Sequence, residues 1–322
     1  MTMQFSDFAA QAAADGRIAP DEIRVLRELG WADGRMDPDE AESLFSANDA
    51  LVEPDRAWCD FFVEALSNFI VHTVEPDGYV DQEMADELVF RIDRDGRVDS
   101  LAELELLVRV LEISTNIPVS LRAYALQQIE AAIEHGEGPT RHGELAGGGI
   151  NTTEVALLRR MIFAPGSEGP ASVRQAEAEL LFRLKDAALY EPNAPEWQKL
   201  FVQGVGNYLL GFAGGEPLSA ERTAELEAFM TTEGAGIGGF LSRMLTSDVE
   251  DAFGSLLGGS EAETTDWEAE AEAAAQLEPH EADWLRDQLD ADEELDDYEK
   301  ALIAFIDAET GESFVPRRSF SA

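Results

Sequence analysis

The sequence is poor in the residues on which several classes of protein depend. It has a single cysteine, Cys59, among its 322 residues, which excludes an internal disulfide. No apolar run approaches the roughly 20 residues that a membrane-spanning helix needs. The first residues lack the basic and apolar regions of a secretion signal. We therefore expect a soluble, cytoplasmic protein without a membrane span.

Lysine is also scarce, because only Lys185, Lys199 and Lys300 are present. In total, 23 basic residues stand against 66 acidic residues, and the formal net charge is −43. Such a charge repels nucleic acid and anionic membranes, and it attracts cations and basic protein surfaces. The expected partner is therefore a protein with a basic surface. The same composition also serves solubility alone, and the sequence leaves the oligomeric state open.

Motifs that carry catalysis are missing too. The four histidines (His72, His135, His142 and His280) are scattered without the paired spacing of metal ligands. No glycine-rich phosphate loop ends in Lys-Ser or Lys-Thr, and "GAGIGG" follows no strand pattern. No nucleophile is paired with a base, so we expect no catalytic residue and no enzyme activity.

Strand-like alternation is nearly absent, whereas helical periodicity runs through most of the chain. Apolar side chains recur at steps of three and four residues, as in Ile23, Leu26 and Leu29. Polar or glycine-containing turns separate such segments from one another. The sequence therefore predicts an all-α fold.

Two long segments of the chain resemble each other. The text "WCDFFVEALSNFIVHTVEPDGYVDQEMADELVF" from Trp58 aligns with "WQKLFVQGVGNYLLGFAGGEPLSAERTAELEAF" from Trp197 at an offset of 139 residues. Upstream, "AESLFSANDALVEP" from Ala41 aligns with "AELLFRLKDAALYEP" from Ala178 at an offset near 137. We predict two tandem, duplicated multi-helix bundles, at residues 1–140 and 141–322.

The second copy has a glycine-rich and acidic insert at about 233–278. A short apolar piece within this insert has two interpretations. It is either an extra helix that docks on the bundle or a segment that binds a partner, since exposed apolar patches mark interfaces.

Acidic residues cluster in the turns between the predicted helices. In "WADGRMDPDEAESLF" (residues 31–45), Asp33, Asp37 and Glu40 fit the second half of a calcium loop. Leu29 and Trp31, however, occupy positions that need oxygen ligands, and no other window has a full ligand set. A complete EF-hand is therefore excluded. The candidates for a weak or composite Ca²⁺ or Mg²⁺ site are Asp33, Asp37, Glu40, Asp77, Asp81, Glu83, Asp95 and Asp99.

The same residues are also typical of the start of a helix. Asp37 is a good N-cap, Pro38 suits the first helical position, and Glu40 completes a capping box. Asp296 and Glu299 repeat this box near the end of the chain. Both interpretations of the acidic turns, as helix caps and as cation ligands, stay open.

The segments "WADGRMDPDE", "AADGRIAPDE" and "LDDYEKALIAFID" resemble the tellurite-resistance TerB-like helical domains, and the resemblance covers about two thirds of the chain in two copies. It implies a compact helical bundle with an acidic surface site for divalent metal. It also implies a role as an interaction module in stress-response or envelope-associated complexes. The second copy departs from the pattern at Gly147–Gly148 and Gly215–Glu216, so any metal site is expected mainly in the first copy.

We therefore predict an acidic, non-enzymatic module for protein interaction or sensing. A divalent cation would stiffen an acidic turn by neutralising its clustered carboxylates. The alternative is an acidic scaffold that binds a basic protein surface and does not respond to ions.

Overall fold

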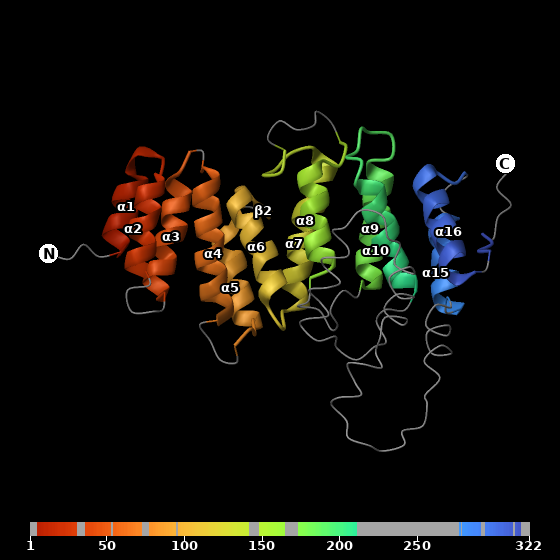
Figure 1. Cartoon of the computed structure of the whole chain (residues 1–322), viewed down its shortest axis with the longest axis horizontal. Coiled ribbons are helices and arrows are strands. Elements are labelled where there is room, and N and C mark those ends of the chain that lie inside the picture. The colour runs from red at the N-terminus through yellow and green to blue at the C-terminus, as the bar shows by residue number, and fades with distance from the viewer. Residues whose placement is uncertain are drawn as a thin grey trace, which may run out of the picture. The chain divides into compact units, whose positions relative to one another are not determined.

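The computed structural model of the chain is built from α-helices, which confirms the predicted all-α class (Figure 1). It describes residues 5–30, 36–52, 54–72, 77–94, 96–141, 148–164, 173–210, 277, 279–290, 294–311 and 313–316. The insert expected at about 233–278 lies, apart from residue 277, outside these ranges. No helix within them has both the length and the apolar character that crossing a membrane requires.

The chain divides into two compact units. The first comprises residues 1–170 and 187–194, and the second comprises residues 171–186 and 195–322. This division differs from the boundary expected at residue 140, because α8 (Thr152–Ile162) packs against α6 and α7 of the first unit. Residues 187–194 join the first unit, where the N–H of Ile150 donates to the side-chain Oδ1 of Asn193 and the N–H of Ala194 donates to the carbonyl oxygen of Ile150. The duplication itself stays a prediction.

The first unit is organised around a central helix, α4, which packs against α2, α3 and α6, while α6 continues the packing to α7 and α8 (Figure 1). Aromatic residues account for this position, since Trp58, Phe61 and Phe62 of α4 are fully buried. The elements of the unit are α1 (Phe5–Ala12), η1 (Ala13–Asp15), α2 (Pro20–Gly30), α3 (Pro38–Ala50), α4 (Arg56–His72), α5 (Gln82–Ile92), β1 (Asp93–Arg94), β2 (Arg97–Val98), α6 (Leu101–Ile113), α7 (Val119–His135) and α8.

Side-chain caps fix where several helices begin. Asp37 Oδ1 accepts the N–H of Glu40 at 2.9 Å, and Glu40 Oε2 accepts the N–H of Asp37 at 3.0 Å, so α3 starts at Pro38 with a complete capping box. A second box at Asp296 and Glu299 starts α16 (Asp297–Thr310). Both predicted boxes are therefore confirmed.

A short antiparallel hairpin joins α5 to α6, where no strand is expected from the sequence. Asp93 pairs with Val98, and Gly96 makes the turn with a φ of 87°, a conformation that favours glycine. The N–H of Val98 donates to Gln128 Oε1 at 2.9 Å, which attaches the hairpin to α7. The end of α5 is thereby held against α7.

The second unit contains α9 (Gln175–Ala187), α10 (Trp197–Leu209), α15 (Pro279–Leu289) and α16, and α10 packs against α16. Aromatic rings hold the helices together. Trp284 of α15 meets Tyr208 and Phe182 edge-on, with ring centroids 4.9 and 5.7 Å apart. Phe201 of α10 meets Tyr298 of α16 at 6.1 Å.

Candidate functional site

The acidic residues expected as cation ligands lie mostly at helix starts. Asp37 and Glu40 form the capping box of α3, and Asp81 is the N-cap of α5, where its Oδ1 accepts the N–H of Met84 at 2.8 Å. Asp77 Oδ1 lies 2.6 Å from Nδ1 of His72. Glu83 is exposed in the first turn of α5. The cap interpretation is therefore confirmed at Asp37 and Glu40.

The remaining candidates do not complete an ion site within the described residues. Asp99 is exposed ahead of α6, and Asp33 and Asp95 lie outside the described ranges. Among the residues described, no three carboxylate, histidine or cysteine side chains come close enough to hold a metal ion. The Ca²⁺ or Mg²⁺ site stays a prediction.

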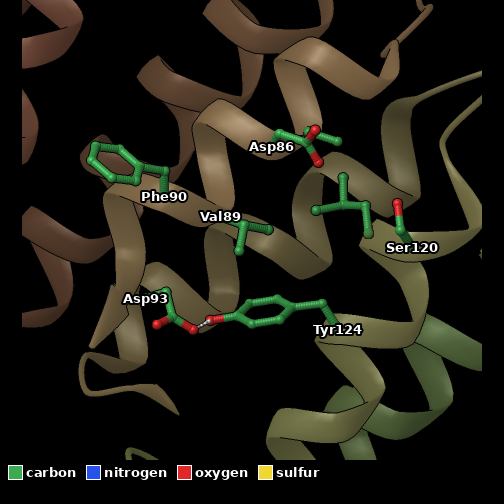
Figure 2. A pocket seen from close by; sticks show the side chains of 8 residues that line it. Asp86, Val89, Phe90, Asp93, Ser120 and Tyr124 are labelled. Atoms are coloured by element: carbon green, nitrogen blue, oxygen red, sulfur yellow. Dashed lines mark hydrogen bonds between the residues drawn. The ribbon is translucent and has the colours of Figure 1, made fainter. Parts of the chain in front are cut away.

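A groove with a volume of about 660 Å³ lies between α5 and α7 (Figure 2). Its floor is apolar, because Ala85 and Leu121 are buried beneath it and Val89 is half-buried. Phe90 stands out from α5 with 84% of its surface exposed. The lining residues are Ala85, Asp86, Val89, Phe90, Asp93, Ser120, Leu121 and Tyr124.

Two polar bridges between α5 and α7 lie at the ends of this floor. At one end, Gln82 Nε2 donates to Ser120 Oγ at 3.0 Å and to Asp86 Oδ1 at 2.7 Å. At the other end, the hydroxyl of Tyr124 donates to Asp93 Oδ2 at 2.9 Å, as Figure 2 shows. Since the hairpin N–H of Gly96 donates to Asp93 Oδ1 at 2.9 Å, both oxygens of Asp93 are held in place. The groove is therefore preformed by contacts between its own walls.

Among the described residues, the charged side chains that line the groove are carboxylates. Asp86 and Asp93 belong to the lining, and no lysine, arginine or histidine whose side chain the structure describes lies beside them. Arg91, the one arginine of α5, pairs with Glu42 and with Glu87. Arg122 of α7 is buried and donates to the carbonyl oxygens of Met161 and Ala164. The groove thus combines an apolar floor with negative charge.

Sequence reasoning did not select this groove, although one signal for it was present. The buried face of α5 is made by Ala85, Leu88 and Ile92 at helical spacing. Phe90 falls outside that stripe, so an aromatic residue on the solvent face of α5 is the feature that could have drawn attention. The pairing of α5 with α7 had no counterpart in the sequence pattern.

The remaining reactive groups do not form a second site in the described part of the chain. Cys59 is half-buried, and burial raises the pKa of its thiol, with the nearby Asp60 and Asp55 adding to the increase. A raised pKa disfavours the nucleophilic thiolate at neutral pH. His135 Nδ1 lies 2.9 Å from the carbonyl oxygen of Ala131 at the end of α7, as expected of a helix-terminal residue.

No protein-family model matches the chain, and no significant match is found among curated proteins or among solved structures. The resemblance to TerB-like domains therefore stays a prediction. The chemistry of the α5–α7 groove is the basis on which a function can be inferred.

Proposed function

We propose that this chain is an acidic, non-enzymatic interaction module whose α5–α7 groove binds a cationic amphipathic segment of a partner protein. The observation that carries this proposal is the composition of the groove, which has an apolar floor and, among the side chains that the structure describes, carboxylates as its charged groups. An apolar side chain of the partner would enter between Val89 and Leu121, and lysine or arginine residues beside it would face Asp86 and Asp93.

The exposure of Phe90 supports a protein partner. A phenylalanine that is 84% exposed leaves most of an aromatic ring in water at the edge of the apolar floor, where a partner that enters the groove would cover it. Aromatic side chains at the centre of a contact commonly supply much of its binding energy. Phe90 is thus the expected anchor on this side of the interface.

The charge of the whole chain supports a basic partner. A net charge of −43 raises the encounter rate with a cationic segment, and this advantage decreases as salt screens the field. The resemblance to TerB-like domains belongs to the same proposal, because it implies an interaction module in cytoplasmic stress-response or envelope-associated complexes. No ion is required for the groove to bind in this way.

A designed peptide tests the proposal directly. The probe is a synthetic amphipathic helix with leucine on one face and lysine on the other, titrated into the full chain by calorimetry. We expect saturable binding that Phe90→Ala weakens by about tenfold, because the anchor is lost. Asp86→Asn should weaken binding several-fold and flatten its dependence on salt, because one charge contact is removed.

Two matched variants serve as controls. Val52→Ala removes another apolar side chain that is 83% exposed, and Asp60→Asn removes another exposed helical carboxylate, both outside the groove. Both should bind the peptide like the wild type. Equal binding by Phe90→Ala and Val52→Ala would exclude the groove as the site. Equal binding of a leucine–glutamate version of the peptide would exclude a cationic partner.

A further inference from the structure

A buried lysine joins two distant parts of the second unit. Lys185 of α9 is only 1% exposed, and its Nζ donates to Asp296 Oδ2 at 2.6 Å and to Glu299 Oε1 at 2.9 Å. Asp186 Oδ1 lies 2.7 Å from the same nitrogen. Asp296 and Glu299 form the capping box of α16, so Lys185 holds the N-terminal end of that helix.

This lysine remains charged in its buried position. Burial lowers the pKa of the Lys185 ammonium, but its hydrogen bonds to Asp186, Asp296 and Glu299 raise the pKa by more, and the result lies above the ordinary lysine value. A buried charge is tolerated when it is paired in this way, and removal of one partner is strongly destabilising.

The first unit has a neutral contact at the aligned position. Asn48 of α3 corresponds to Lys185 at the same offset of 137 residues that aligns Ala41 with Ala178. Its Nδ2 lies 3.5 Å from Oε1 of Glu103, the third residue of α6, just as Glu299 is the third residue of α16. Its Oδ1 accepts the indole N–H of Trp58 at 3.1 Å.

The second unit has a lysine where the first has an asparagine, and this difference leaves one buried hydrogen-bond donor without an acceptor among the described residues. An amide both donates and accepts, whereas an ammonium only donates. The indole N–H of Trp197, aligned with Trp58, is buried and has no hydrogen-bond partner among the described residues. The stronger pairing with Asp296 and Glu299 compensates for this unsatisfied donor.

The two helix ends that meet these positions differ in charge. The N-cap of α16 is Asp296, whereas the N-cap of α6 is Ser100, which has no carboxylate. The end of α16 therefore presents two carboxylates to Lys185, those of Asp296 and Glu299, whereas the end of α6 presents the carboxylate of Glu103 to Asn48. The ammonium reaches both carboxylates, whereas an amide such as that of Asn48 would leave the buried Glu299 and the half-buried Asp296 without a counter-charge.

The apolar contacts around the two positions are alike, so they do not determine whether α6 or α16 packs there. Phe45 and Phe62 meet edge-on at 5.6 Å beside Asn48, and the aligned Phe182 and Phe201 meet edge-on at 5.2 Å beside Lys185. Moreover, α10 ends at Leu209 and α15 begins at Pro279, so no short connection directs the last two helices to their place.

We propose that Lys185 is a pairing determinant that selects α16, through Asp296 and Glu299, for the surface of α9 and α10. Asn48 would give the equivalent surface of α3 and α4 the opposite preference, for the end of α6 that presents Glu103. The two similar sites are thereby protected from exchanging their helices during folding, since each carries a different buried polar group.

Hydrogen exchange of the full chain tests this proposal. Lys185→Met should reduce the protection of α15 and α16 amides on the order of a hundredfold, while α4 and α6 keep theirs. The control is Lys300→Met, on α16 itself, whose Nζ is exposed and lies 3.4 Å from Asp297; it should retain protection. Equal protection in the two variants would overturn the proposal, and so would an equal loss in α4 and α6.

An exchange variant separates pairing from general core support. Lys185→Asn alone should lose protection like Lys185→Met, because Asp296 and Glu299 would face an amide. Lys185→Asn combined with Asp296→Ser recreates the residues found in the first unit, and it should recover protection and slow the exchange of the Trp197 indole N–H. Equal loss with and without Asp296→Ser would overturn the proposal. If Lys185→Met fails to fold, Glu299→Gln, which keeps the helix cap, should show an intermediate loss, and wild-type protection there would contradict a charge-based selection.

Discussion

Asp296 performs two tasks with the two oxygens of one carboxylate. Its Oδ1 accepts the N–H groups of Tyr298 and Glu299 and starts α16, whereas its Oδ2 accepts the ammonium of Lys185. Asp37 occupies the same position of a capping box at α3, and the contact described for its side chain is the one to the N–H of Glu40 within that box. At the scale of residues, the role of an acidic side chain thus depends on what faces the helix start.

Asp37→Ala tests whether the acidic turn before α3 acts as a cap. We expect the first unit to lose about 1 kcal/mol in its free energy of unfolding, because the N–H of Glu40 loses its acceptor. Urea unfolding in EDTA and in Ca²⁺ measures this loss, and the two conditions should agree.

Asp39→Ala is the matched control for this variant, since Asp39 is an exposed acid in the first turn of the same helix and should cost only a few tenths of a kcal/mol. A stabilisation by Ca²⁺ that Asp37→Ala abolishes would instead support the predicted cation site.

At the scale of elements, glycine determines how closely α10 approaches its neighbours. A Cβ atom at Gly206 would lie 2.5 Å from Cε1 of Phe305 on α16, and one at Gly204 would lie 2.4 Å from Cδ1 of Leu181 on α9. Glycine within a helix costs about 1 kcal/mol relative to alanine, so these positions exchange helix propensity for close packing. The second unit depends on this contact because α10 is the helix against which α16 packs.

Gly206→Ala should therefore destabilise the second unit in spite of its higher helix propensity. We expect a loss of about 1–3 kcal/mol, because the methyl group would overlap the half-buried ring of Phe305 and force it to move. Guanidinium unfolding followed by circular dichroism measures the loss. Lys199→Ala, at an exposed position of the same helix, is the control and should be neutral. A stabilised Gly206→Ala variant would mean that α16 can shift without cost.

Features that depend on neighbouring residues in the chain could be predicted from the sequence. The capping boxes at Asp37 and Asp296 were predictable, because each depends on residues three apart in the chain. The β1–β2 hairpin was not, since its two-residue strands are too short to show alternation.

The groove was not predictable either. It depends on hydrogen bonds between residues 31 and 38 apart in the chain, at Asp93–Tyr124 and Gln82–Ser120. Lys185 is 111 residues from Asp296 and 114 residues from Glu299 in the chain, and no local sequence pattern indicates contacts between residues so far apart.

At the scale of the whole molecule, charge opposes folding. A chain with a net charge of −43 repels itself more strongly when it is compact than when it is extended. Salt reduces this repulsion, and at about 0.15 M the screening length is about 8 Å. The surface ion pairs that salt also weakens are worth little individually.

We therefore expect added NaCl to raise the unfolding midpoints of both units by a few degrees. Calorimetric scans at increasing salt measure the change. MgCl₂ at matched ionic strength is the control for specific binding: an equal effect identifies screening, whereas a larger effect of Mg²⁺ would point to a bound divalent ion. A fall in the midpoints with NaCl would contradict self-repulsion as the dominant effect.

The unlike surroundings of Trp58 and Trp197 provide the molecule with an internal optical reference. One indole donates to an amide oxygen and the other has no acceptor in the part of the chain that the structure describes, although both are fully buried. The excited state of an indole responds to its hydrogen bonding, so the two chromophores should emit at different wavelengths. Because Trp31, Trp267 and Trp284 also emit, fluorescence follows each of these two indoles separately in variants in which the other tryptophans are replaced by phenylalanine.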